Sequence, residues 1–242
     1  MAHAQIAFPV GESWVVGSFG DAGALIEATA SSVLQRCDIV EIRLDVLLAQ
    51  GAEPVRGLWG QLAGVPLLFT ARRGDEGGAV GMDAAQRASL LTAVLDDAAC
   101  IDIEVASHDA MGGILAEAQR RGIPWIASYH DFEKLPASEV LEEAAQKARA
   151  AGAAVFKVAA RLNTVADVLR LAEFQLSSQG LPLATMGMGA LAPASRLLCA
   201  QCGSVLNYGY LGTTPTAPGQ WDCGLLKQAL SQSLQPARLA RP

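Results

Sequence analysis

The sequence predicts a single-domain α/β protein of the (β/α)8, or TIM, barrel class, and two regularities support this prediction. Eight short apolar runs recur along the 242 residues, starting roughly 23 to 34 residues apart, which is the length of one strand, one helix and two loops. Between most of them lie stretches rich in Ala, Leu and Glu with helical spacing. Alternating strands and helices build a covered parallel sheet, and eight such units in about 250 residues fit a closed barrel. The alternative is a doubly wound open sheet, but its usual first turn, GxGxxG, is not matched by SFGDAG at residues 18–23.

The predicted strands, in order, cover residues 14–18, 39–45, 66–71, 100–105, 124–130, 154–159, 181–186 and 204–208. The clearest helices are predicted over residues 84–98 and 137–151, where apolar residues recur at helical spacing. A third helix is predicted over residues 163–178, because it begins with the cap-like pair Asn163 and Thr164.

The interval after the second strand is the weakest part of the pattern. Three helix-breaking residues interrupt it: Gly51, Pro54 and Gly57. We expect a helix to begin there near residues 53–55. The domain is expected to span residues 1–242, with a short N-terminal arm at 1–13 and a flexible tail at 233–242.

Composition narrows the class of protein. The chain is 51% hydrophobic and 17% charged, with a net charge of −6, so it can build a large core but offers no basic surface for nucleic acid or an anionic membrane. Five cysteines indicate reduced thiols, and Cys199 and Cys202 lack the second CxxC or nearby histidine that a metal site would need. Neither a signal peptide nor an apolar run of about 18 residues is present, so we expect a cytoplasmic protein.

A single lysine interrupts the sixth apolar run, AAVFKVAA at residues 153–160. Burial on a strand disfavours the ammonium form of Lys157 and would free an amine nucleophile near neutral pH. The alternative is a lysine whose stem lies along apolar surface while its head reaches solvent. The sequence of this run alone leaves both interpretations open.

Charged residues collect where the predicted strands end, which is the catalytic end of a barrel of this class. Glu41 and Arg43 alternate with apolar residues at the end of the second strand, and we expect Asp45 to continue that row. The loop after the third strand carries Arg72 and Glu76, and His130 ends the fifth strand. Each of these residues could instead have a purely structural role: Glu41 and Arg43 could form an internal ion pair, Arg72 could be solvated, and His130 could cap a helix. Neighbouring strands five and six should bring His130 and Lys157 into one pocket. A base beside a desolvated lysine, surrounded by arginines, indicates Schiff-base chemistry on an anionic carbonyl compound.

Six segments, in order, resemble the type I 3-dehydroquinate dehydratase family of the shikimate pathway. They are EIRLD (41–45), TARRGDEGG (70–78), SYHDF (128–132), FKVAARLNT (156–164), MGMGALAPASR (186–196) and TAPGQ (216–220). The resemblance implies a (β/α)8 barrel that uses no metal and no organic cofactor. It also implies a small-molecule substrate, 3-dehydroquinate, a role in aromatic amino acid biosynthesis, and a homodimer.

The resemblance implies three catalytic residues. Lys157 would form the imine with the substrate ketone, His130 would act as general base and acid, and Glu76 would hold the histidine in place. It also implies a set of substrate-binding residues: Ser18, Glu41, Arg43, Arg72, Met186, Met188, Arg196, Thr216 and Gln220. Among these, Arg196 would bind the carboxylate, and Thr216 and Gln220 would close over it as a lid.

The sequence departs from the family pattern near residues 190–194, where Ala192 replaces a common glycine and Pro193 follows. Thr216 stands where serine is frequent, and Leu135 where threonine is frequent. Two other functions compete with dehydration: a class I aldolase-like Schiff-base lyase, and a non-catalytic barrel that binds a small acid. The first would show a glycine-rich phosphate site after strands seven and eight, and the second would need no nucleophile with a base beside it.

Overall fold

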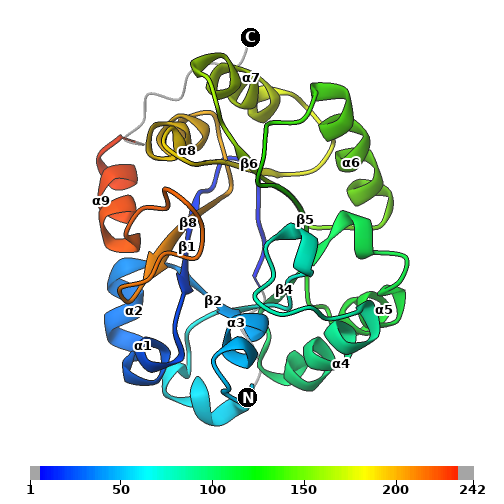
Figure 1. The fold of residues 1–242 in the computed structure, drawn as a ribbon, viewed down its shortest axis with the longest axis vertical. Helices are drawn as coiled ribbons and strands as arrows, with labels where there is room; N and C mark the ends of the chain where they lie inside the picture. The colour runs from blue at the N-terminus through cyan, green and yellow to red at the C-terminus, as the bar shows by residue number, and fades with distance from the viewer. Residues whose placement is uncertain (1–5, 234–242) are drawn as a thin grey trace.

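The computed structural model describes residues 6–233 of the chain. Eight strands form one parallel sheet in the order β7-β6-β5-β4-β3-β2-β1-β8, surrounded by helices (Figure 1). The strands are β1 Trp14–Phe19, β2 Ile39–Arg43, β3 Leu67–Thr70, β4 Cys100–Glu104, β5 Trp125–Asp131, β6 Val155–Arg161, β7 Leu183–Met188 and β8 Leu206–Leu211. Each strand pairs in parallel with its neighbour in the chain, and β1 also pairs with β8.

The two ends of the sheet meet at β7 and β8. The Val205 amide donates to the Leu183 carbonyl at 3.0 Å, and the Thr185 amide donates to the Ser204 hydroxyl at 3.2 Å. The sheet is therefore a nearly closed barrel, which confirms the predicted (β/α)8 class and excludes the open doubly wound sheet.

Nine helices of the described chain lie outside this barrel. They are α1 Ala22–Glu27, α2 Ala30–Arg36, α3 Leu44–Ala49, α4 Ala84–Val94, α5 Gly112–Arg120, α6 Ser138–Ala150, α7 Val165–Leu176, α8 Ala192–Gln201 and α9 Cys223–Ser233. Thr164 caps α7 in a capping box with Asp167, as its sequence indicated. The helix predicted over 84–98 ends at Val94 and continues only as the 3-10 turn Leu95–Asp97.

The prediction for the segment after β2 was wrong. The strand ends at Arg43, α3 begins at Leu44, and Asp45 lies in the first turn of that helix rather than on the strand. No α-helix begins near residues 53–55; that stretch leads instead into the 3-10 turns Arg56–Leu58 and Gly60–Leu62. Gly51 takes a positive φ of 72°, which ends α3, and Pro54 and Gly57 disfavour a new helix.

The strands β5 to β8 extend further toward the catalytic end than the apolar runs predicted. Pairing continues to Asp131 opposite Ala160 and to Arg161 opposite Met188. The apolar pattern stops early on β5 and β6 because these strands end in the charged residues Asp131 and Arg161.

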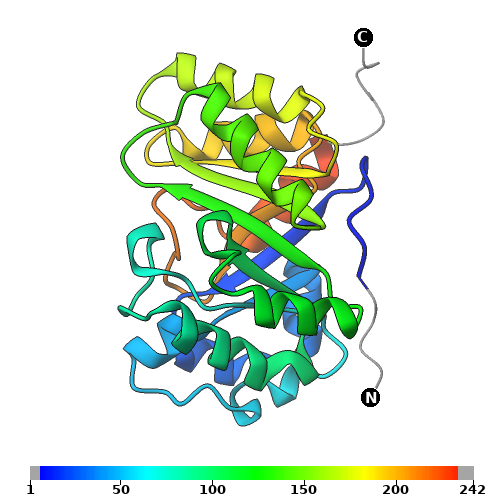
Figure 2. The same cartoon turned by 90° about the vertical axis from the view of Figure 1, so that its right-hand side faces the viewer.

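The barrel interior is apolar in its lower half, the half nearest the N-terminal ends of the strands. One buried cluster takes a residue from every strand: Val16, Ile39, Leu68, Cys100, Ile126, Val155, Ala184 and Leu206. Ile6 and Phe8 of the N-terminal arm join it. Figure 2 shows this blue segment passing the end of the barrel where the strands begin. The predicted tail, apart from Ser233, lies outside the described residues.

No helix in the described part of the chain is long and apolar enough to cross a membrane.

Candidate active site

A cavity of about 50 Å³ lies among the ends of the strands. Eleven of the twelve residues predicted for the site line it: Glu41, Arg43, Arg72, Glu76, His130, Lys157, Met186, Met188, Arg196, Thr216 and Gln220. Ser18 is fully buried on β1, but it does not line this cavity. The cavity is much smaller than the few hundred Å³ of a typical ligand pocket.

Lys157 lies on the interior face of β6, between Val155 and Ala159 of the same face, and its residue is 3% exposed. Its Nζ donates to Asp102 Oδ2 at 2.7 Å and lies 4.4 Å from the centre of the Tyr208 ring. Burial lowers the pKa of Lys157 below 10.5, and the neighbouring Asp102 carboxylate opposes part of that shift. The lysine head is therefore inside the barrel, which excludes the solvent-reaching interpretation.

Asp102 is the partner of Lys157 that the sequence did not assign. Its Oδ1 accepts from Ser128 Oγ at 2.6 Å and forms an ion pair with Arg72 Nη2 at 2.9 Å. Burial alone would raise the pKa of Asp102, but Arg72 and Lys157 outweigh it and lower that pKa to about 2. The carboxylate is therefore ionised at every physiological pH, between two cations.

Arg72 connects this carboxylate to a second one. Its Nη1 donates to Glu104 Oε1 at 2.9 Å and to Ser128 Oγ at 2.6 Å. Burial alone would lower the pKa of Arg72, but Asp102 and Glu104 raise it instead. Both terminal nitrogens of Arg72 thus contact protein side chains, so its main effect in this state is to hold Asp102 and Glu104 apart and in place.

His130 and Glu76 lie at the rim, on β5 and on the 3-10 turn Gly74–Glu76. Glu76 Oε2 is 2.9 Å from the His130 amide and 3.0 Å from its Nδ1. Because the amide can only donate, this oxygen is an acceptor, and Nδ1–H donating to the same oxygen leaves Nε2 with a free lone pair. Burial, together with Arg72 and Lys157, lowers the pKa of His130 well below 6.5, so the ring is neutral.

Burial also raises the pKa of Glu76 to about 7, despite the opposing effect of Arg72. A carboxyl group whose pKa is raised and an imidazole whose pKa is lowered therefore lie in contact. The Glu76 side chain is 12% exposed and the His130 side chain 8%, so both are largely shielded from solvent. Paired groups with displaced pKa values are typical of acid–base sites.

Glu41 and Arg43 do not form the internal pair considered from the sequence. Glu41 Oε1 accepts from Thr70 Oγ1 at 2.9 Å. Arg43 instead makes a two-pronged contact with Asp45, at 2.9 and 2.7 Å. Asp45 also accepts from the Ala79 amide at 2.9 Å, so it fixes both the arginine and the loop after β3.

Arg196 lies in the second turn of α8 and lines the cavity, and the residue is 3% exposed. Its Nη1 donates to the Tyr208 carbonyl at 2.7 Å, while its Nε is buried with no partner among the described residues. Burial lowers the pKa of Arg196 to about 10. An arginine that is buried without a carboxylate is costly, and an anionic ligand in the cavity would relieve that cost.

Thr216 and Gln220 form a strap across the mouth, at residues 216–220 after β8. Gln220 Oε1 accepts from the Thr216 amide at 2.8 Å and from its hydroxyl at 2.9 Å. Ala192 and Pro193, where the sequence departs from the family pattern, lie in the first turn of α8. The Gly189 amide donates to the Pro218 carbonyl at 3.1 Å, which joins the strap to that loop.

Met186 and Met188 are buried on β7 and form the apolar side of the cavity with Ala159 and Ala217. Tyr208, which the sequence analysis did not single out, covers the lysine from β8, and its hydroxyl has no partner among the described residues. The alternation rule applied to β8 would have placed it on the interior face with Leu206.

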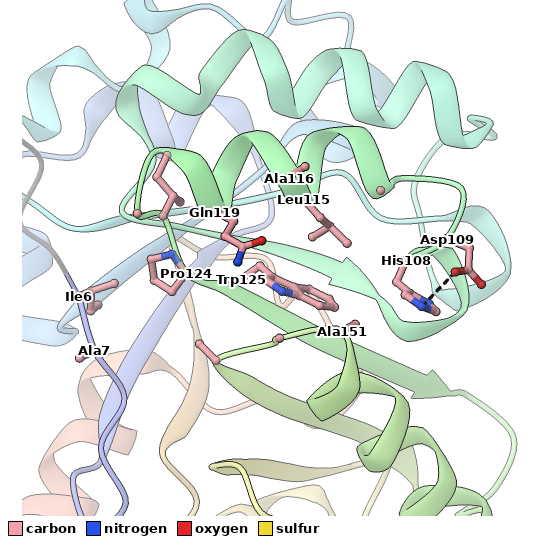
Figure 3. Close-up of a pocket in the computed structure, with 15 residues that line it drawn as sticks. Ile6, Ala7, His108, Asp109, Leu115, Ala116, Gln119, Pro124, Trp125 and Ala151 are labelled. Atoms are coloured by element: carbon pink, nitrogen blue, oxygen red, sulfur yellow. Dashed lines mark ion pairs between the residues drawn. The ribbon is translucent and has the colours of Figure 1, made fainter.

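A larger cavity, of about 830 Å³, lies outside the barrel along α5 and the turn before β6, and extends from Pro124 before β5 to His108 beyond the end of β4 (Figure 3). Trp125 and Pro124 at the start of β5, Gln119 of α5 and Ile6 line it, and His108 pairs there with Asp109 at 3.2 Å. The lining of this cavity lacks a nucleophile with a base beside it, whereas the small cavity holds Lys157 and His130. The small cavity is therefore the candidate active site.

No group of three or more His, Cys, Asp or Glu side chains that could hold a metal ion occurs between residues 6 and 233. All five cysteines are free thiols, including Cys199 and Cys202.

Comparison with known proteins identifies the family. The model of the type I 3-dehydroquinase family matches residues 19–236. The chain is 33% identical to the 3-dehydroquinate dehydratase of Methanocella arvoryzae over 183 residues, which cover 76% of this chain and 81% of that protein. It is 31% identical to the enzyme of Methanosarcina barkeri over 216 residues, with 85% and 89% covered.

The fold agrees with a solved structure of an enzyme of the same name. The 3-dehydroquinate dehydratase of Geobacillus kaustophilus superposes with a TM-score of 0.81 at 24% identity, covering 94% of this chain and 93% of that one. A match at this identity shows the fold alone, and the sequence matches supply the family. The chain belongs to the type I 3-dehydroquinase family and is a hydro-lyase.

Proposed function

We propose that this protein removes water from 3-dehydroquinate to give 3-dehydroshikimate, through an imine between the substrate ketone and Lys157. The observation that supports this most is the position of the Lys157 amine. It is buried, and it lies in one cavity with the His130–Glu76 pair. The proposed reaction needs no metal ion and no organic cofactor.

In the first step the neutral Lys157 amine attacks the ketone carbon. Asp102, 2.7 Å from Nζ, accepts a hydrogen bond from the nitrogen and stabilises its positive charge as the carbon–nitrogen bond forms. His130 Nε2 takes a proton from the attacking nitrogen and passes it to the former ketone oxygen. A second proton, taken up from solvent and released again when the iminium is hydrolysed, lets that oxygen leave as water and gives the iminium. Burial supports this step because it lowers the pKa of Lys157 and so raises the fraction of free amine.

In the second step His130 removes the proton next to the iminium carbon. The carbon–hydrogen electrons form an enamine, since the iminium is a much better electron sink than the ketone. The enamine then expels the hydroxyl group one carbon further on, and His130 returns its proton so that water leaves. Hydrolysis of the conjugated iminium releases the enone and restores Lys157. Glu76 supports both proton transfers because its Oε2 holds Nδ1 and leaves Nε2 free toward the cavity.

Substrate binding is assigned to the residues around this pair. Arg196, whose buried Nε has no partner within residues 6–233, would bind the carboxylate with its guanidinium. Glu41, Arg43 and Arg72 would face the ring hydroxyls, and Met186 and Met188 would contact the ring. Thr216 and Gln220 would move apart to admit the substrate and then close over its carboxylate, since a cavity of about 50 Å³ is too small to hold the substrate. Ser18, which is buried on β1 and does not line the cavity, is assigned to substrate binding from the family resemblance alone.

Reduction with borohydride tests the imine. Wild-type protein treated with 3-dehydroquinate and borohydride should gain one reduced ligand mass, located on Lys157 by peptide mass spectrometry. Lys157→Ala should gain none and should form no conjugated enone in an ultraviolet assay, with an unchanged circular dichroism spectrum. Lys227→Ala is the matched control, because that lysine pairs with Asp38 at 2.8 Å far from the cavity lining. Labelling elsewhere, or enone formation by Lys157→Ala, would refute the mechanism.

We also infer that the protein works as a homodimer in the cytoplasm, on the strength of the family resemblance. Sedimentation equilibrium at micromolar concentration should give twice the mass of 25.2 kDa. A single species of monomer mass would contradict the dimer.

A further inference from the structure

A fully buried row of charges leads from the catalytic lysine to a helix outside the barrel. Lys157 contacts Asp102, Asp102 contacts Arg72, and Arg72 contacts Glu104, at 2.7, 2.9 and 2.9 Å. The row continues to Arg87 of α4, whose Nη1 lies 2.5 Å from Glu104 Oε2. Charges alternate in sign along the row, from the lysine cation to the Arg87 cation.

Arg87 is placed where it determines the orientation of Glu104. Glu104 Oε1 accepts from Arg72 and, at 3.0 Å, from the Arg73 amide, whereas the side-chain partner of Oε2 is Arg87. The guanidinium is itself held by Ser107, at 2.9 Å from Nη2. Arg87 is 4% exposed and does not line the cavity.

This placement is costly for a purely structural contact. The Arg87 Nε is buried without a partner among the described residues, and a buried ion pair contributes little or nothing to stability relative to apolar packing. A link between α4 and β4 could therefore be made by apolar side chains at lower cost. What the ion pair adds is a positive charge at the outer end of the row.

We propose that Arg87 is a positioning residue that holds Glu104, so that Arg72 stays shared between Glu104 and Asp102 and keeps its positive charge beside Lys157. The inference rests on the proposed function, because it assigns the free amine of Lys157 a role. Without Arg87, Glu104 keeps its charge through Arg72 and the Arg73 amide, and draws Arg72 away from Asp102. The interior then carries one more uncompensated negative charge, which favours the ammonium form of the lysine.

The groups facing Lys157 make the direction of this effect definite. Asp102 of β4 and Glu41 of β2 favour its charged form, and Arg72, in the loop after β3, disfavours it. From β5 comes the neutral His130, and from β8 the face of Tyr208. Loss of a cation from the far side of the row therefore raises the pH at which the amine becomes free.

The test measures the titration of Lys157 directly, so that it does not depend on catalysis. The chain has four lysines, at 134, 147, 157 and 227, so 15N-labelled lysine gives few NMR signals, and the missing signal in Lys157→Met assigns the one of interest. Arg87→Met should raise the titration midpoint by about one pH unit, the size expected for a charge about 10–15 Å away at an effective dielectric constant of about 20. Its kcat at neutral pH should fall about three- to tenfold with KM changed less than twofold, and Arg87→Lys should restore the midpoint.

Two further variants separate this role from a structural one. Ser107→Ala removes the other side-chain partner of Arg87 and should leave the midpoint and kcat unchanged. Glu104→Gln should lower the midpoint, and the double variant Arg87→Met with Glu104→Gln, in which both buried charges are gone, should return it to near the wild-type value. If Arg87→Met does not fold, the rise from Glu104→Gln to the double variant measures the same effect.

An unchanged midpoint in Arg87→Met, or in the double variant relative to Glu104→Gln, would overturn the proposal. Equal changes in Ser107→Ala and Arg87→Met would also overturn it, because they would show a structural role. Failure of the proposed function is distinct: wild-type protein would then form no borohydride-reducible adduct at Lys157, whatever the titration shows.

Discussion

Asp102 gives the sharpest test of how the site is held together. It is 1% exposed, and replacing it with asparagine keeps its shape but removes the charge between Arg72 and Lys157. Its pKa is lowered from 3.8 to about 2, which by linkage corresponds to about 2–3 kcal/mol of folding stability. Breaking a buried ion pair on one side costs about 3–5 kcal/mol. We therefore expect Asp102→Asn to lower the free energy of unfolding by about 3 kcal/mol at pH 7.

The sign of the pH dependence adds a second signature. Because the pKa of Asp102 is lowered by folding, its contribution is complete above pH 4 and disappears as the pH falls through 2. The difference in urea unfolding between wild type and Asp102→Asn should therefore shrink over that window. Asp102 also supports the charged form of Lys157, so the pH needed for borohydride trapping should fall in the variant.

Asp222→Asn is the matched control, because Asp222 pairs with Arg36 at 2.5 Å with its side chain 26% exposed. An exposed pair of this kind contributes about 1 kcal/mol or less. The variant should also leave the pH dependence of trapping unchanged. A loss below 1 kcal/mol in Asp102→Asn, or a difference independent of pH, would refute the assignment of Asp102 as the ionised centre of the row.

Three other predictions concern the strap, the carboxylate site and metals. Gly219→Ala should raise KM several-fold in steady-state assays, because φ is +73° there and an added Cβ would lie 2.2 Å from the Gly189 carbonyl oxygen. Gly11→Ala, at φ +97° with open space around it, is the control. Equal KM values for the two variants would contradict the role of the strap. Arg196→Met should raise KM at least tenfold while the unfolding midpoint stays the same or rises, since a buried guanidinium with a free Nε is lost; a fall in stability with unchanged KM would indicate a structural arginine. Dialysis against a chelator should leave kcat unchanged, and inhibition reversed by added metal would argue against metal-free chemistry.

Much of the site could be predicted because the barrel converts sequence position into spatial position. Parallel strands end on one side, so polar residues that follow apolar runs meet there whatever their separation in the chain. His130 and Lys157 illustrate this, since they lie on neighbouring strands whose register places Ser128 opposite Lys157. The order of the strands was therefore enough to predict which of the residues at the strand ends lie close together.

What could not be predicted depends on contacts across the barrel. The sequence placed Asp102 and Glu104 on a strand, but their partners Lys157, Arg72 and Arg87 come from three other elements. The course of the chain after β2 also escaped prediction, because Asp45 leaves the strand to accept hydrogen bonds from residues beyond β3. Both outcomes are decided by which buried groups need partners, and this is a property of the folded interior rather than of any one segment.

The apolar filling of the lower half of the barrel has a consequence for the order of events in turnover. Ile6, Phe8 and interior residues near the start of each strand fill that half. The ketone would therefore enter, and the enone leave, through the same end, which the strap covers. Entry and exit along one route cannot overlap in time. The product has to depart before another substrate is admitted, and it competes with substrate for the empty protein. Turnover would then respond to solvent viscosity whenever the strap moves more slowly than bonds are made and broken.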